Sequence, residues 1–426
     1  MPQPPESPPF KSQPADLHAA PGELSVRSGP LAWLTPRVAT SVMFFINGLV
    51  FATWVLHIPD VRDALRLSDA QVGTAILGIA VGSMFSMPLS GHWIVRHGSA
   101  AVTRLFAVLF CLSLPLPFLA GNLGTLFLAL TALGLTSGAM DVAMNAQGVA
   151  VERRLKRPVL SSFHAWFSLG NLAGALAGSL LLGLGVGLWT HVLGILAVSL
   201  LAVGVCALRL LPRRYDSHEG EAAPAAPEIS VPWIQRFRLS PLVASMGLLC
   251  FLGMLAEGAT GDWSGLYFRD VLAATGGLVG LGYAAFTLAM TLGRTFGDRW
   301  RSRYGDGPLV IAGALLGGLG VLTAVLSSSP LLAGLGYALT GLGAANIVPV
   351  LYGAAGRTMN ARGIAQVATL GYLGFLAGPP LIGYVSHLLN LRAGLLVIAL
   401  SLLLVAVLGP GVFGQLNPVK PRAMRP

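Results

Sequence analysis

The sequence contains two copies of one hydrophobic unit. HWIVRHG at 92–98 returns as RWRSRYG at 299–305, and RDAL at 62–65 returns as RDVL at 269–272. Two further echoes follow in the same order at nearly the same spacing: LTALG at 130–134 with LTGLG at 339–343, and LGNLAG at 169–174 with LGFLAG at 373–378. Ordered matches of this kind indicate an internal duplication, so the chain is expected to fold as two similar halves.

Both halves are too apolar for a water-soluble domain. Only 10% of the residues are charged, against roughly 25% in ordinary soluble proteins. Apolar runs long enough to cross a bilayer as a helix of about 20 residues occur along the whole chain. They lack the alternation of barrel strands, and a helix satisfies its own backbone groups. The sequence therefore predicts an all-α membrane protein with 12 transmembrane helices in two six-helix bundles. The approximate spans are 38–58, 70–93, 100–120, 124–149, 160–186, 188–210, 241–266, 276–297, 308–328, 330–356, 363–388 and 392–414.

The positions of the basic residues predict the orientation in the membrane. Of the 27 Lys and Arg residues, only Arg62, Arg66, Arg269 and Arg392 fall in the loops expected outside. Because cytoplasmic loops are enriched in Lys and Arg, this bias predicts that both termini are cytoplasmic. The net charge of +10 is spread over separate loops and forms no contiguous basic face, so we expect no nucleic-acid partner.

Composition also predicts the domain organisation. We expect a disordered cytoplasmic tail at 1–36, a first bundle at 37–210, a cytoplasmic linker at 211–238, a second bundle at 239–414 and a cytoplasmic tail at 415–426. The first tail is Pro-rich and lacks the apolar core and cleavage site of a signal peptide. The linker contains AAPAAP and a cluster of acids, a composition that does not pack.

The sequence offers little for an enzyme or a metal centre. Cys111, Cys206 and Cys250 fall on different predicted helices without ligand spacing, so we interpret them as apolar fillers. A nucleophile with its base, a phosphate loop and a metal cluster are all missing from the pattern. We expect no enzymatic activity, no cofactor and no metal.

Three acids fall within predicted membrane helices. They are Asp141 in the fourth helix and Glu257 and Asp262 in the seventh. An acid at the centre of a membrane helix costs about 2.5–3.5 kcal/mol, so such acids are usually retained for function. The alternative interpretations give these acids no function: Asp141 then bonds a neighbouring helix for packing alone, and Asp262 is an ordinary interfacial carboxylate.

The duplication provides an internal comparison for these acids. Val350, Val50 and Val55 occupy the positions that match Asp141, Glu257 and Asp262 in the other copy. A shared scaffold role would place acids in both copies, so the difference favours a functional role. Desolvation lets such an acid take and release a proton near neutral pH. Asp141, Glu257 and Asp262 are therefore the predicted proton-coupling residues. His164, at a depth comparable to Asp141, is a further candidate as its partner or relay, although a lone histidine is more often structural.

Amide and aromatic side chains near the middle of the membrane are the predicted solute-binding groups. Paired amides and flat rings suit hydroxyl-rich or other small polar solutes. The candidates are Asn47, Trp54, Asn145, Asn171, Trp263, Tyr283, Asn346 and Tyr372, and we expect about half of them to line a cavity between the bundles.

The inside ends of the helices supply the gating candidates. We predict that the segment GRTFGDR at 293–299 is an inside loop whose Asp and Arg side chains form ion pairs that hold the inside gate closed. An equally favoured interpretation is that these charges only set the topology of the chain in the membrane. The residues concerned are Arg96, Arg294, Asp298, Arg299 and Arg303. The pair Pro379 and Pro380 is expected to kink the eleventh helix and to expose carbonyl groups to a cavity. Glycines on the fifth and eleventh helices are most simply explained by close packing.

At this point the chain resembles the major facilitator superfamily from about residue 36 to 414. Segment 293–299 is similar to the superfamily's loop signature, and 91–98 is a degenerate copy with Val95 in place of the aspartate. DVAMNA at 141–146 resembles the fucose-permease-like branch, including its poorly characterised bacterial members. That resemblance implies that Asp141 and Asn145 contribute to sugar binding and proton coupling. The branch's acid in the first helix has no counterpart in the uncharged segment 51–55.

Together these features predict a secondary active transporter that works by alternating access in a bacterial inner (plasma) membrane. The expected solute is sugar-like or another small polar molecule, and the expected coupling ion is the proton. The alternative is proton-driven efflux of a drug or metabolite. A membrane-embedded receptor or enzyme is the remaining alternative. The expected partners are the solute, protons and the lipid bilayer, without nucleic acid, and we expect a monomer.

Overall fold

The computed structural model describes residues 34–155, 159–216, 240–358 and 361–416, and every regular element among them is helical. The first half contains α1 (Pro36–Leu56), α2 (Ile58–Leu65), α3 (Asp69–His97), α4 (Ser99–Ser113), η1 (Leu116–Leu119), α5 (Leu123–Leu155), α6 (Leu160–Gly183), α7 (Leu188–Ala207) and η2 (Arg213–Tyr215). The second half contains α9 (Pro241–Leu266), η3 (Tyr267–Val271), η4 (Gly276–Gly280), α10 (Leu281–Tyr304), α11 (Asp306–Leu326), α12 (Pro330–Ala344), α13 (Ile347–Thr358), α14 (Ala361–Leu388) and α15 (Leu391–Leu416).

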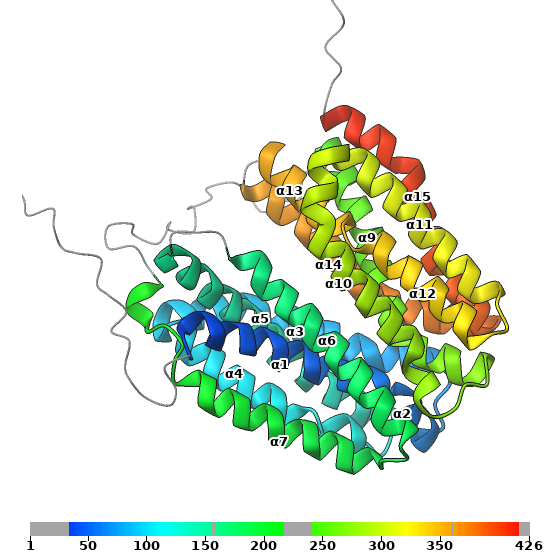
Figure 1. Ribbon diagram of the computed structural model, residues 1–426, viewed down its shortest axis with the longest axis horizontal. Coiled ribbons are helices and arrows are strands. Elements are labelled where there is room, and N and C mark those ends of the chain that lie inside the picture. The colour runs from blue at the N-terminus through cyan, green and yellow to red at the C-terminus, as the bar shows by residue number, and fades with distance from the viewer. Residues whose placement is uncertain (1–33, 156–158, 217–239, 359–360, 417–426) are drawn as a thin grey trace, which may run out of the picture.

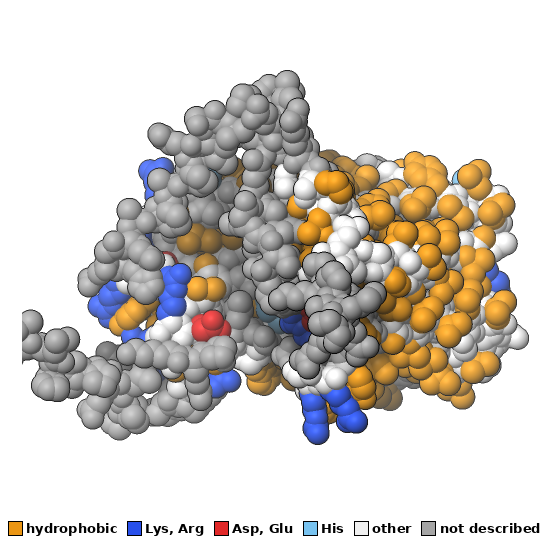
Figure 2. Space-filling view, turned by 90° about the horizontal axis from the view of Figure 1, so that it is seen from above, with side chains coloured by type: hydrophobic (Ala, Val, Ile, Leu, Met, Phe, Trp, Pro, Cys, Tyr) orange, Lys and Arg blue, Asp and Glu red, His pale blue; other side chains and the backbone are white. Residues whose placement is uncertain are grey.

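The predicted number of membrane spans is confirmed. Within the described residues, 12 helical segments are long and apolar enough to cross a membrane, six in each half, and their bounds follow the apolar runs closely. α12 and α13 together make one span, Pro330–Ala355. In the view of Figure 2, the described side chains on the right, over the second half, are largely hydrophobic, as expected for a surface that faces lipid.

Equivalent helices of the two halves begin and pack alike. α1 and α9 each start at a proline, after Thr35 and Ser240, whose hydroxyls accept a hydrogen bond from the backbone amides of Val38 and Val243. Proline suits this position because its missing amide would be unpaired anyway. α1 packs against α6 in the first half, and α9 packs against α14 in the second. The duplication is therefore visible in local structure and in packing.

The two bundles meet at one end of the molecule and diverge toward the other (Figure 1). The end that carries α2 and η4 is named the α2 end here, and the opposite end, which carries α13, is named the α13 end. The strongest contacts between the halves join α3 to α14 and α6 to α10 and η4. Predicted orientation places the α2 end outside the cell.

Two glycines allow α3 and α14 to touch through their backbones near the α2 end. A Cβ on Gly73 would collide with the carbonyl oxygen of Pro379, and a Cβ on Gly383 would collide with that of Asp69. Larger residues would push the helices apart, so these glycines fix the approach of the two halves.

The structure corrects one sequence expectation and leaves others outside its range. Residues 293–299, predicted as an inside loop, lie within α10, which continues to Tyr304. Apolar length alone underestimated this helix because its last turns are basic. Pro379 and Pro380 lie inside the continuous helix α14. The predicted disordered tails and linker fall almost entirely outside the described residues.

Candidate functional site

A cavity of about 590 Å³ lies between the two halves, a size typical of small-molecule sites. Its wall is built from α1, α3, α5 and α6 of the first half and from α9, α10 and α14 of the second. Met84 and Tyr372, midway along their helices, are 61% and 46% exposed, whereas Ile76 and Asp262, nearer the α2 end, are 4% and 8% exposed. The cavity is therefore accessible from the α13 end and closed at the α2 end.

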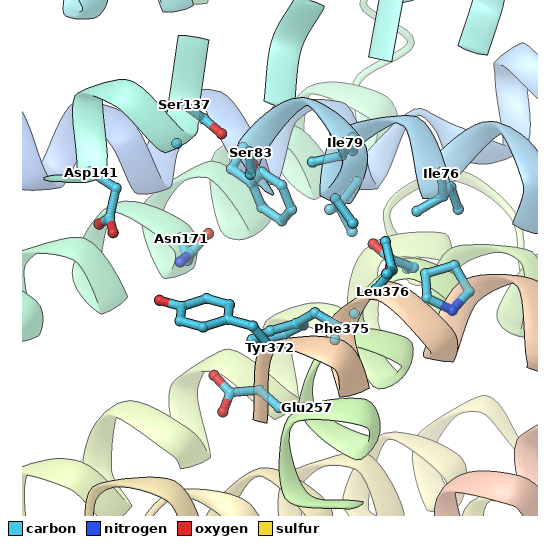
Figure 3. Close-up of a pocket in the computed structure, with 18 of the residues that line it drawn as sticks. Ile76, Ile79, Ser83, Ser137, Asp141, Asn171, Glu257, Tyr372, Phe375 and Leu376 are labelled. Atoms are coloured by element: carbon cyan, nitrogen blue, oxygen red, sulfur yellow. The ribbon is translucent and has the colours of Figure 1, made fainter. Parts of the chain in front are cut away.

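All three predicted intramembrane acids reach this cavity. Asp141 comes from α5, and Glu257 and Asp262 come from α9. Figure 3 shows Asp141 and Asn171 on one side of the space and Tyr372 and Glu257 on the other. The acids thus lie in both halves of the wall.

The surroundings of the three carboxylates differ. Arg294 donates a hydrogen bond of 2.7 Å to Glu257, so that acid already has a cationic partner. Asp141 accepts a hydrogen bond of 3.2 Å from the Asn145 amide, which is neutral. Asp262 accepts no hydrogen bond from the residues that the structure describes. Val55, the residue at the matching position of the first half, also lines the cavity. Among the residues that the structure describes, Asp141 and Asp262 are therefore carboxyl groups without a cationic partner.

Amide and phenol groups connect the halves inside the cavity. The Tyr283 hydroxyl on α10 donates a hydrogen bond of 3.2 Å to Asn171 Oδ1 on α6. Asn47 Nδ2 on α1 is buried and lacks a partner among the described residues, while its side chain borders the same space. A buried donor without a partner is costly, so a solute acceptor at this position would stabilise the protein.

Five of the eight predicted solute-binding residues lie in the cavity wall or directly behind it. Asn47, Asn171, Tyr283 and Tyr372 line the cavity, and Asn145 stands behind the wall, where it holds Asp141.

The remaining three candidates lie outside the cavity lining. Trp54 is buried in the first bundle with its ring 6.0 Å from that of Phe118. Trp263 is fully buried. Asn346 donates to the carbonyl oxygen of Gly293, so it joins α10 to the break between α12 and α13. The sequence predicted how deep these residues lie in the membrane, but it did not show which face of each helix they occupy.

His164 does not join Asp141 in the structure. Its ring packs edge-on against Phe44 at 5.3 Å, and it lies outside the cavity lining. This position corrects the predicted pairing, because the His164 ring packs against α1 and makes no contact with Asp141 among the described residues.

The gating candidates are also dispersed. Arg294 binds Glu257 inside the cavity and Pro379 forms part of its wall, while Pro380 lies outside the lining. Arg96, Arg299 and Arg303 are exposed at helix ends. The side chain of Asp298 lies outside the described residues.

Residues that sequence reasoning missed include most of the apolar lining. α3 contributes Ile76, Ile79, Ser83 and Met87, spaced by three and four residues along one face. Because α3 is apolar on its other faces too, hydrophobic periodicity gives no signal for the inward one.

The four charged residues of the two RD dipeptides were also overlooked, although the repeat displayed them. At the α2 end Arg62 pairs with Asp270, and Arg269 pairs with Asp63 at 2.8 Å. Each half thus contributes one cation and one anion to the other. Arg62 also contacts Asp69 at 3.1 Å. These crossed ion pairs join the halves on the closed side of the cavity.

Comparison with known proteins agrees with this architecture. The model of the Major Facilitator Superfamily matches residues 39–283 and 263–424. A relative from Yersinia pestis, described as an uncharacterised MFS-type transporter, is 35% identical over 378 residues, 88% of this chain and 94% of that protein. Membrane protein MosC of Rhizobium meliloti is 35% identical over 373 residues, 86% and 87% of the two chains.

Solved transporters share the fold at low sequence identity. A mutant of the nucleoside transporter NupG matches with a TM-score of 0.72 and 13% identity over 89% of this chain and 100% of its own. FucP in an outward conformation matches with a TM-score of 0.60 and 16% identity, over 89% and 99%.

Twelve membrane-spanning helices in two duplicated bundles, with a cavity between them, define a secondary transporter. The chain belongs to the Major Facilitator Superfamily, so the predicted family is confirmed. It is a multi-pass membrane transporter and not an enzyme.

Proposed function

We propose that this transporter moves a small polar solute through the central cavity by alternating access, coupled to protons, in a bacterial inner membrane. The observation that carries the proposal is the pair of carboxyl groups, Asp141 and Asp262, that face the cavity with no cationic partner in the described part of the chain. A carboxylate in such a wall is costly unless it is protonated or meets a cation. Loading and release of a proton at these groups can therefore be linked to solute binding.

The roles within the cavity follow from the contacts. We assign proton exchange to Asp141 and Asp262, because Glu257 is already joined to Arg294. The groups around these two acids are Asn145, Tyr372 and Tyr283, together with the Glu257–Arg294 pair. Asn47 and Asn171 are the proposed hydrogen-bonding groups for the solute. Both contributions must act in the same closed space for binding and proton uptake to influence each other.

The decisive experiment measures solute uptake by purified protein in liposomes, with and without an imposed pH gradient. We expect at least one small polar solute to accumulate in response to the gradient. Asp141→Asn should abolish this response while exchange of solute across the membrane continues. Val350→Leu, at the matching position of the other copy, is the control. A variant whose accumulation still follows the pH gradient would contradict the role of Asp141.

Proton-driven efflux is the second candidate function, because most of the cavity wall is apolar, with Met84, Met87 and Met290 among its residues. Such a wall can accommodate solutes of varied shape. Deleting the protein from cells distinguishes the directions: internal solute falls if the transporter imports and rises if it exports.

A further inference from the structure

The charged residues in the cavity wall are unbalanced. Among the described residues that line the cavity, those with charged side chains are Asp141, Glu257, Asp262 and Arg294. Arg294 and Glu257 bind each other at 2.7 Å and so neutralise one another. One carboxyl group in each half, Asp141 in α5 and Asp262 in α9, is left without a cationic partner.

This imbalance constrains the charge of the solute. An anionic solute would meet further negative charge, which like-charge repulsion disfavours. A neutral polyol could donate hydrogen bonds but would supply no countercharge, so the two acids would have to remain protonated in the largely apolar wall while it is bound. A solute with a positive group would supply countercharge that the two acids lack.

The rest of the wall suits such a cation. Rings of both halves line the cavity, and they are Phe51, Phe167, Tyr283, Phe286, Tyr372 and Phe375. The face of an aromatic ring attracts a cation, and more strongly where water is excluded. The same rings, with the neighbouring methionine side chains, would contact the apolar part of a solute.

We infer that the solute is a small organic cation, a protonated amine with an apolar or ring-shaped body, and that Asp141 and Asp262 are its counter-ions. This inference rests on the proposed function and narrows its solute class. Asn47 Nδ2, buried without a partner beside the same space, then binds an acceptor on the body of the solute.

Matched pairs of probes test the charge requirement directly. The purified full-length protein is screened by thermal shift with cyclohexylamine against cyclohexanol and with phenethylamine against phenethyl alcohol. Glucose and myo-inositol serve as neutral polyols. We expect the amines to raise the apparent melting temperature and their alcohols to have little effect, since ligand binding stabilises the folded state. Binding by polyols alone, equal binding within each pair, or no binding by any amine overturns the inference.

Variants locate the counter-ions. Asp262→Asn and Asp141→Asn should each weaken amine binding at least tenfold, whereas Asp262→Glu, which keeps the charge, should retain most of it. Asp306→Asn is the control, because Asp306 pairs with Arg301 at the end of α10, away from the cavity. Unchanged amine affinity in both Asn variants would refute the assignment. Size-exclusion profiles of each variant show whether it is folded.

Transport in liposomes separates this inference from the proposed function. Radiolabelled amine and radiolabelled polyol are offered in parallel. Transport of the polyol without the amine would overturn the cationic solute class and leave the proposed transport intact. If neither these probes nor a broad library of small solutes moves, the proposed function itself fails.

Discussion

The α2 end and the cavity wall use the duplicated sequence in opposite ways. At the α2 end both copies carry the RD dipeptide, and Arg62 and Arg269 reach across to the acid of the other copy. In the cavity the copies differ, with Asp262 in one half where Val55 lies in the other. Two copies that face each other can pair through identical residues, because each presents a cation and an anion to its counterpart. A single solute that binds between the two halves does not require the same residues in both of them.

The largest expected effect comes from making the cavity symmetric. The double variant Asp141→Val and Asp262→Val places an apolar residue at these positions in both copies. Loss of one partner from a desolvated charge pair costs roughly 2–5 kcal/mol, about 30-fold or more in affinity, so we expect amine binding and solute accumulation to disappear. Binding is measured by thermal shift and accumulation in liposomes. Retained accumulation would show that the difference between the copies has no role in transport.

Inverting one dipeptide should break the symmetric contact. Arg62→Asp with Asp63→Arg sets like charges against Asp270 and Arg269, and we expect the α2 end to open more often, by about tenfold for two exposed pairs. Inverting the second dipeptide as well restores opposite charges between the halves and should restore most of the closure, except for the contribution of the Arg62–Asp69 contact. Alkylation of Val55→Cys by a membrane-impermeant maleimide measures the opening. Equal alkylation in the single inversion and the parent protein would contradict a closing role.

The Glu257–Arg294 pair should contribute more to the stability of the folded protein than to the selection of the solute's charge. Glu257→Gln or Arg294→Gln alone leaves the other charge unpaired in the cavity wall. Because the two side chains are 21% and 30% exposed, we expect each single variant to lose about 1–2 kcal/mol, less than for a fully buried pair. The double variant should recover most of this loss. Thermal unfolding of the three proteins checks it, and a double variant as unstable as the sum of the singles would argue against pairing.

The smallest effect is expected for Asp63→Asn. Asp63 is 66% exposed, so its contact with Arg269 should contribute well under 1 kcal/mol. Asp270→Asn should open the α2 end more, since Asp270 is 29% exposed and contacts both Arg62 and Arg269. The maleimide assay orders the two variants. A larger increase in alkylation for Asp63→Asn than for Asp270→Asn would contradict this order.

Much of the fold could be predicted from the chain, and less of the site. Apolar length located the 12 spans, but it missed the basic end of α10, where helix continues beyond the apolar run. Membrane depth singled out Asp141 and Asp262, both of which line the cavity. It could not separate Asn171, which lines that cavity, from Trp263, which packs inside its own bundle. That separation depends on the rotation of each helix, which apolar composition on every face leaves undetermined.

The sequence by itself determined the duplicated membrane architecture, because burial in lipid requires long apolar helices and because copied segments remain recognisable. It also determined which acids have no counterpart in the other copy. Only the tertiary structure decided that Glu257 is paired with Arg294 while, among the described residues, Asp141 and Asp262 have no cationic partner. It alone showed that the repeated RD dipeptides meet at the α2 end. These contacts act over a few ångströms between residues far apart in the chain, so they depend on how the helices rotate and on how the two halves approach each other.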